Sequence, residues 1–277
     1  MPCTDRLPLW ALLAGLFLLA LLGGCAPVVT SDGRLPAPGI EGEQLLAAWT
    51  AQAGRYQAVQ GLAKVKVKTP ERSASGTQVI IARRPGQLRA ETLSPFGTTL
   101  LLLATDGTDL GVLVPSQNRY YFGKADADNV GRFTKIPVEP ITLVNTLLYD
   151  APVLAFSKVT TWSLPAGGWV VELSRWGGRQ ELVFDSQRRL IAMRYFENGD
   201  PVLTIDYNDF PETGPVFPRQ VGLHLYKYDV EARMTFEEVE LDRSPAPGLF
   251  RLEPPVGVET YDLDFILYST DKVGEKR

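Results

Sequence analysis

An alternation of apolar and charged residues constrains the fold of this 277-residue chain more than any other feature. In the stretch LAKVKVK, residues 62–68, Ala63, Val65 and Val67 alternate with three lysines. Successive side chains of a β-strand point to opposite faces of a sheet. A period of two therefore predicts a half-buried antiparallel strand with one wet face, and the other face must be covered.

Strand-like runs recur along most of the chain, at residues 78–83, 88–93, 98–104, 110–114, 119–122, 169–174, 181–184, 190–196, 201–207, 219–228 and 231–241. Dipeptides that suit tight hairpin turns separate several of them: Asp106-Gly107, Gly177-Gly178 and Asn198-Gly199. The pattern predicts a mainly β fold, a single antiparallel sheet of about eleven strands that curls into a barrel or half-barrel. In the last run the apolar phase slips between Phe236 and Val239, which predicts a β-bulge.

Two segments have helical spacing instead. Residues 43–60 place several apolar side chains on one face, namely Leu45, Leu46, Trp49, Ala53 and Tyr56. We expect an N-terminal helix that covers the sheet. Residues 140–150, PITLVNTLLYD, begin with a proline suited to a first helical turn and carry Ile141, Val144, Leu147 and Leu148 at helical spacing. A helix there could lie across the open mouth of the sheet.

The N-terminus has the pattern of an export signal. An apolar run at residues 7–22 follows Arg6, and small residues come directly after it. The sequence Leu-Gly-Gly-Cys that ends at Cys25 resembles a bacterial lipobox, although an ordinary secretory signal with an incidental cysteine is the alternative. We predict a lipoprotein signal peptide at 1–24, a lipidated Cys25 with a flexible tether at 25–42, and a folded domain at 43–277. Ala26, where a retention signal would have Asp, implies sorting to the outer membrane.

Composition argues against several classes of function. The net charge is −4, so the chain has no general attraction for nucleic acid. Its two cysteines, Cys3 and Cys25, would leave the exported domain without a free thiol, and its one histidine, His224, lies in a strand pattern where a structural role is expected. No phosphate-binding loop or catalytic triad can be assembled. We therefore expect no enzyme, no metal and no cofactor.

Apolar residues exceed what a flat sheet with one wet face requires. If the sheet curls, those on its inner side either fill a core or line a cavity that could hold a ligand. Together with the four apolar residues of the 140–150 helix, the candidate lining residues are Trp169, Val171, Leu173, Leu203, Ile205, Met234 and Phe236.

Three stretches resemble a known family. They are WTAQAGRYQAVQGLAKVKV near the first strand, LSPFGTTLLLLATDG around Phe96, and LFRLEPPVGVETYDLD at 249–264. Over most of the chain they are similar to the LolA/LolB-like lipoprotein-carrier fold, and closest to LolB-type outer-membrane lipoproteins.

This resemblance implies an incomplete antiparallel barrel with a helical lid and an apolar cavity for acyl chains. A LolB-type protein receives lipoproteins from a periplasmic LolA-like carrier and inserts them into the outer membrane. Phe96 matches the apolar loop residue that enters the bilayer, with the alternative that its ring folds back into the core. The large domain, the long tether and the insertion at 125–136 depart from the family pattern.

Three functions remain open. The first is a monomeric, outer-membrane-anchored protein facing the periplasm that binds acyl chains and receives or inserts lipoproteins or other lipids. The second is a scaffold or envelope-sensing lipoprotein that uses the same fold to bind a protein partner, which predicts a filled interior. The third, a lipid hydrolase, lacks an evident pair of nucleophile and base.

Overall fold

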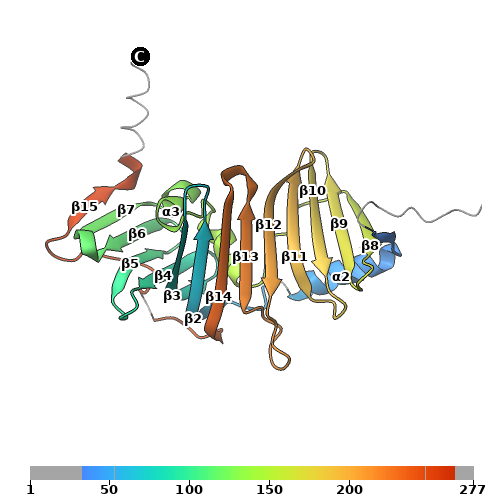
Figure 1. Cartoon of the computed structure of the whole chain (residues 1–277), viewed down its shortest axis with the longest axis horizontal. Helices are drawn as coiled ribbons and strands as arrows, with labels where there is room; N and C mark the ends of the chain where they lie inside the picture. The colour runs from blue at the N-terminus through green and yellow to red at the C-terminus, as the bar shows by residue number, and fades with distance from the viewer. Residues whose placement is uncertain (1–32, 53, 247, 266–277) are drawn as a thin grey trace, which may run out of the picture.

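The computed structural model of the protein describes residues 33–52, 54–246 and 248–265. These residues form one sheet of fifteen strands (Figure 1). In their order across the sheet, the strands are β1 (Leu35–Pro36), β8 (Lys158–Ser163), β9 (Trp169–Arg175), β10 (Gly178–Phe184), β11 (Leu190–Glu197), β12 (Asp200–Asn208), β13 (Gln220–Leu225), β14 (Val230–Leu241), β2 (Ala58–Lys68), β3 (Ser73–Arg83), β4 (Gln87–Leu93), β5 (Thr99–Thr105), β6 (Asp109–Val114), β7 (Arg119–Lys124) and β15 (Glu259–Asp262).

The sheet is open, because β1 and β15 are its two edges and do not pair with each other. Every neighbouring pair is antiparallel except β15, which runs parallel to β7. The strands near β9 stand upright in Figure 1 and those near β6 lie almost across the view, which is the cumulative twist expected of a long sheet. The predicted mainly β fold, one curled sheet that does not close, is confirmed.

The predicted number of about eleven strands is wrong. The strands that the sequence pattern did not predict are β1, β8 and β15. β1 has two residues and β15 has four, too few to display a period of two, and β8 reads KVTTWS, without clear alternation. All three lie at or next to an edge of the sheet, where one side of a strand needs no apolar partner.

The predicted β-bulge is present, and so is one of the three predicted two-residue turns. Gly177-Gly178 is not the turn between β9 and β10, because Gly178 already pairs with Arg175, and Asp106-Gly107 lies in a longer connection between β5 and β6. The register of β14 on β2 shifts between Phe236 and Glu238, so the β-bulge is confirmed. Asn198 and Gly199 have φ angles of 51° and 94°, the left-handed values that a two-residue hairpin turn requires.

The helices α2 (Gly39–Gln52), α3 (Ala127–Thr134) and α4 (Pro140–Leu147) accompany the sheet, and residues 263–265 are also helical. Two short 3-10 turns, η1 (Pro115–Gln117) and η2 (Tyr226–Tyr228), lie in strand connections. None of the described helices is long and apolar enough to cross a membrane. The signal peptide and Cys25 lie outside the described residues, so their assignments stay predictions. Residues 33–42 of the predicted tether contain β1 and the start of α2.

Helix α2 and the segment after α4 cover one half of the inner face, over β8–β12. Leu45 and Trp49 of α2 are buried, and the ring of Tyr149 meets Trp49 edge-on at 5.0 Å and Tyr207 at 4.8 Å. Gly42 lets α2 approach β8 closely, since a Cβ there would overlap the Thr161 hydroxyl. This half of the inner face is therefore a filled core.

Arg84 joins the end of α4 to the turn between β3 and β4. Its guanidinium donates to the Asn145 side chain at 2.6 Å, to Asp150 at 2.5 Å and to the backbone carbonyl of Tyr56 at 3.0 Å. Asp150 also accepts from the backbone amide of Gly54. These bonds hold the C-terminal end of α4 against the sheet.

Glu181 lies on the outer face of β10 among three arginines. Its carboxylate is within 3.1 Å of Arg34, 2.5 Å of Arg179 and 3.3 Å of Arg194, and its side chain is only 4% exposed. Burial alone would raise the pKa of Glu181, but the three guanidinium groups outweigh it and hold that pKa below its usual value. Since Arg34 directly precedes β1, this cluster ties the N-terminal edge to the sheet.

We predict that Glu181→Gln lowers the free energy of unfolding by about 2 kcal/mol at pH 7, because it weakens bonds to three charged partners. A depressed carboxyl pKa adds stability that is complete above the unfolded value of about 4.3 and is lost as pH falls through the folded value. The difference between the two proteins should therefore shrink below about pH 4. Urea unfolding at several pH values measures it. A constant difference from pH 7 to pH 3 would contradict the prediction.

Candidate functional site

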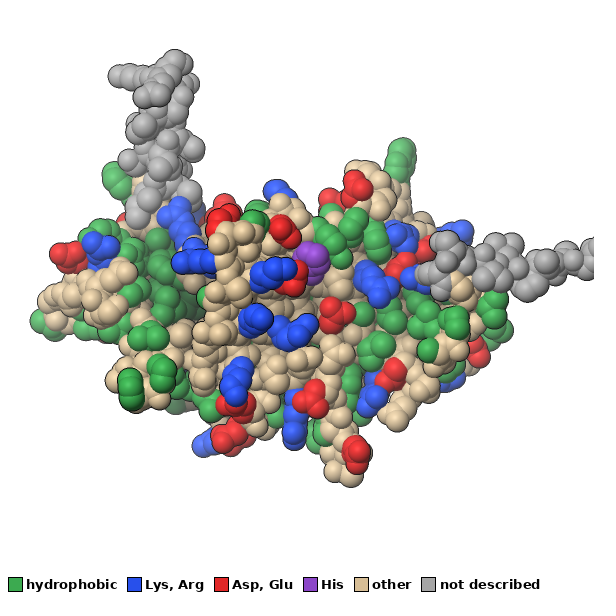
Figure 2. All heavy atoms as spheres, viewed as in Figure 1, with side chains coloured by type: hydrophobic (Ala, Val, Ile, Leu, Met, Phe, Trp, Pro, Cys, Tyr) green, Lys and Arg blue, Asp and Glu red, His purple; other side chains and the backbone are tan. Residues whose placement is uncertain are grey.

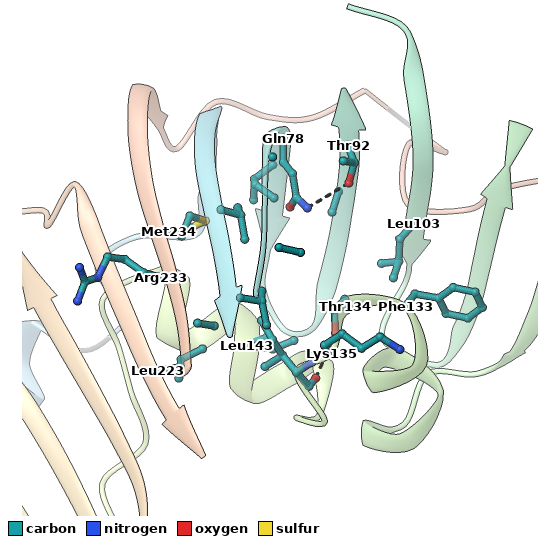
Figure 3. A pocket seen from close by; sticks show the side chains of 18 of the residues that line it. Gln78, Thr92, Leu103, Phe133, Thr134, Lys135, Leu143, Leu223, Arg233 and Met234 are labelled. Atoms are coloured by element: carbon teal, nitrogen blue, oxygen red, sulfur yellow. Dashed lines mark hydrogen bonds between the residues drawn. The ribbon is translucent and has the colours of Figure 1, made fainter. Parts of the chain in front are cut away.

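A cavity of about 300 Å³ occupies the other half of the inner face, where β13, β14 and β2–β5 curve around it (Figure 3). Most of the lining is apolar. The lining residues are Val65, Val67, Thr69, Arg72, Ala74, Ser75, Gly76, Gln78, Ile80, Leu88, Ala90, Thr92, Leu101, Leu103, Phe133, Thr134, Lys135, Ile136, Leu143, Leu147, Val221, Leu223, Ala232, Arg233 and Met234. The volume is at the lower end of the range for small-molecule sites.

The cavity has a buried floor and an exposed mouth. Ile80, Leu88 and Leu103 are buried at its floor, whereas Arg72 and Lys135 at the other end are exposed. Space-filling atoms show a hollow on the left of the molecule, lined by hydrophobic side chains and with Lys or Arg atoms at its upper edge (Figure 2). A ligand with an apolar tail and a polar end would match this gradient.

Small residues create the space. Across the sheet Met234 pairs with Val65, and Val65 pairs with Gly76. Val67 likewise pairs with Ala74 on β3. On the inner face of β3 a glycine and an alanine thus stand where larger side chains would fill the hollow, and the apolar side chains around them are left only partly buried.

The polar side chains inside the cavity are partly satisfied. The Gln78 amide donates to the Thr92 hydroxyl at 3.1 Å, as the dashed line in Figure 3 marks. Arg233 belongs to the lining through its backbone, because its side chain points away from the cavity (Figure 3). Apolar residues therefore outnumber polar ones in the lining, as in most sites for apolar ligands.

The insertion at 125–136 forms one wall. Asp126 caps α3 by accepting from the Asn129 amide at 2.8 Å, and Lys135, the C-cap that follows the helix, has a left-handed φ of 64°. Phe133 packs against Tyr121 of β7 with ring centroids 5.1 Å apart. The segment from Phe133 to Ile136 then borders the cavity. No sequence pattern had indicated this role.

The predicted helix near residues 140–150 is α4, which packs against β3 and β4. Its Leu143 and Leu147 line the cavity, Val144 is buried and Ile141 is 51% exposed. Leu148, just after the helix, is also buried. The helix therefore closes part of one end of the cavity, and a movement of α4 as a lid stays a proposal.

Only two of the predicted lining residues, Leu147 and Met234, border the cavity. Of the predicted strand residues, Val171, Leu173 and Ile205 are buried in the filled half, and Trp169 and Leu203 are partly buried there. Phe236 is buried on β14, with its ring 6.3 Å from that of Phe217. Trp169 also donates its indole N–H to Glu41 of α2 at 3.0 Å. Most of these residues belong to the half of the inner face that α2 and Tyr149 cover.

Phe96 stands at the tip of the turn between β4 and β5 and is 93% exposed. The Ser94 hydroxyl accepts from the backbone amides of Phe96 at 3.2 Å and Thr98 at 3.1 Å, and Gly97 has a φ of 79°. Leu100, 46% exposed, follows on β5. The alternative in which the ring folds into the core is wrong, and the turn presents it to the surroundings.

The described residues offer little for catalysis. Within them, no three His, Cys, Asp or Glu side chains gather as a metal site would require. His224 stacks on Tyr226 with ring centroids 3.9 Å apart, the structural role that its strand position indicates.

Comparison with known proteins supports the fold. No family model matches the chain, and no curated protein matches it. Among solved structures, a DUF1329 family protein from Desulfovibrio piger has 10% identity, covers 77% of this chain and 97% of its own, and has a TM-score of 0.50. A LolA superfamily protein from Nitrosomonas europaea has 13% identity, covers 76% of this chain and 97% of its own, and has a TM-score of 0.46.

An open curled sheet around an inner apolar cavity defines the class of this protein. More specifically, the chain shares its fold with the DUF1329 family protein over 77% of its own length. At identities this low the likeness concerns the fold alone.

Proposed function

We propose that the protein binds acyl chains in the cavity and, as a lipid-anchored protein of the outer membrane facing the periplasm, receives or inserts lipoproteins or other lipids. The observation that carries the proposal is the cavity itself, apolar at its floor and open at its mouth. Val65, Val67 and Leu101 are only partly buried where they line the cavity. They therefore lack the packing contacts that a filled core would provide. An apolar ligand would restore that burial.

The exposed tip supports the membrane part of the proposal. Phe96 gains nothing from its position in water, but entry of one Phe side chain into an apolar phase is worth roughly 1.5–3 kcal/mol. That magnitude gives a weak and reversible contact, which suits a protein already held near the bilayer by lipidated Cys25. A periplasmic LolA-like carrier would then be the donor of the cargo.

A protein partner remains the second candidate because of one observation. Trp176, at the turn between β9 and β10, is fully exposed and lies beside the filled half of the sheet. An exposed Trp is a frequent anchor of protein interfaces. In this scaffold or sensing function the cavity would hold no lipid.

Native mass spectrometry separates the two functions. The chain from Ala26 onward contains every described strand and the whole described core, so it can be purified without Cys25 or detergent. We expect co-purified lipid or acylated peptide that a fluorescent acyl probe displaces at micromolar concentration. A protein that carries no lipid and does not bind the probe would contradict acyl binding and favour the scaffold function.

A further inference from the structure

The mouth of the cavity carries two cations from different parts of the chain. Arg72 lies in the turn between β2 and β3, where its backbone carbonyl accepts from the Thr69 amide at 2.8 Å. Lys135 lies on the opposite wall, at the end of α3, and its ammonium group donates to the Arg132 carbonyl at 3.0 Å. Figure 3 shows Lys135 next to Thr134 and Phe133, at the end of α3.

The acidic residue Glu71 lies close enough to both cations to interact with them electrostatically. The hydrogen bond from the Thr69 hydroxyl, at 2.8 Å, is the largest cause that lowers the pKa of Glu71, and Arg72 and Lys135 lower it further. Glu71 thus lies within electrostatic range of both cations. It offsets one of the two charges and leaves the mouth with a net positive charge.

The cations are not committed to structural ion pairs. Neither Arg72 nor Lys135 forms a salt bridge with any residue that the structure describes, whereas Lys64 and Lys68 on the outer face of β2 pair with Glu237 and Glu231. The guanidinium and ammonium donors at the mouth are therefore available to an anion.

We propose that the cavity takes an anionic amphiphile: an acyl chain along the apolar floor, with a carboxylate or phosphate head group held at the mouth by Arg72 and Lys135. This inference rests on the proposed function, since it specifies the class of ligand for the same site. The limited cavity volume of about 300 Å³ favours a single chain over several, as in a fatty acid or a lysophospholipid. A fatty acid supplies the carboxylate and a phospholipid supplies the phosphate.

Competition binding at pH 8 and low salt tests the head group. The chain from Ala26 onward is loaded with a neutral fluorescent acyl probe, which is displaced by oleate, by oleoyl lysophosphatidate or by neutral monooleoylglycerol. We expect the better anion to displace the probe at a concentration about tenfold lower than the neutral lipid does. The preference should weaken in 0.5 M salt, because exposed charges are screened.

Matched variants assign the preference to the mouth. The double variant Arg72→Gln, Lys135→Gln should lose the preference for anions, so that oleate and oleoyl lysophosphatidate displace the probe no better than monooleoylglycerol does. Glu71→Gln removes the competing carboxylate and should enlarge the preference. Preference for oleate alone identifies a fatty acid, for lysophosphatidate alone a phospholipid, and for both an unselective anion site; each result supports the proposal.

Two results would overturn it. If the wild type binds the three lipids equally, or if the double variant keeps the preference, the head-group inference fails while acyl binding stands. If none of the lipids displaces the probe, or the probe itself does not bind, both the inference and the proposed function fail.

Discussion

Replacement of Val65 with Trp is expected to lower the affinity for an acyl probe by about a hundredfold. Val65 lines the cavity between Met234 on β14 and Gly76 on β3, so an indole ring at this position would occupy the space. Each methylene excluded from an apolar site costs about 0.8 kcal/mol. Exclusion of four methylenes therefore costs roughly 3 kcal/mol, which is about two orders of magnitude in the dissociation constant. A titration with the probe measures it.

The adjacent residue provides the control. Lys66 follows Val65 on β2 but faces outward and is exposed, so Lys66→Trp adds the same ring without entering the cavity. We expect this variant to bind the probe like the wild type. Thermal unfolding of both variants checks that the sheet is intact. Equal binding by Val65→Trp and Lys66→Trp would mean that the probe binds elsewhere.

The sequence predicted which side chains share a face of the sheet better than it predicted whether they fill a core or line a cavity. The alternation of β2, β9 and β12 assigned Val65, Val171 and Ile205 to the inner face, where the structure has them. It could not tell that Trp49 of α2 and Tyr149 cover β9–β12, because a strand's period reports which side is buried and not which element covers it. The cavity was therefore expected among residues that form the filled core.

Two other features had no clear signal in the sequence. α3 has only eight residues, and its apolar positions are too few to show a helical period, so its place at the cavity wall depends on long-range packing. The space itself comes from Gly76 and Ala74 opposite Val65 and Val67. Small residues within a strand weaken a strand prediction and do not announce a cavity.

We predict that Phe96→Glu slows the delivery of ligand to a bilayer without a change in ligand affinity. Phe96 is distant in the sheet from the floor of the cavity and is not among its lining residues. The substitution removes roughly 1.5–3 kcal/mol of apolar transfer free energy and adds a charge that the hydrocarbon region excludes. Probe transfer from the loaded protein to vesicles should therefore slow by at least about tenfold, while titration of the probe in solution should match the wild type.

Phe96→Leu is the matched control for this prediction. Leu keeps an apolar side chain at the tip of the turn, where the Ser94 hydroxyl and the positive φ of Gly97 hold the backbone. We expect near-normal transfer from this variant, because a branched aliphatic group still enters the bilayer. Trp176→Glu tests a second exposed tip, at the turn between β9 and β10, and should leave transfer unchanged if Phe96 alone meets the bilayer. Normal transfer by Phe96→Glu, or an equal loss in Trp176→Glu, would show that insertion of Phe96 is not the step that delivers the ligand.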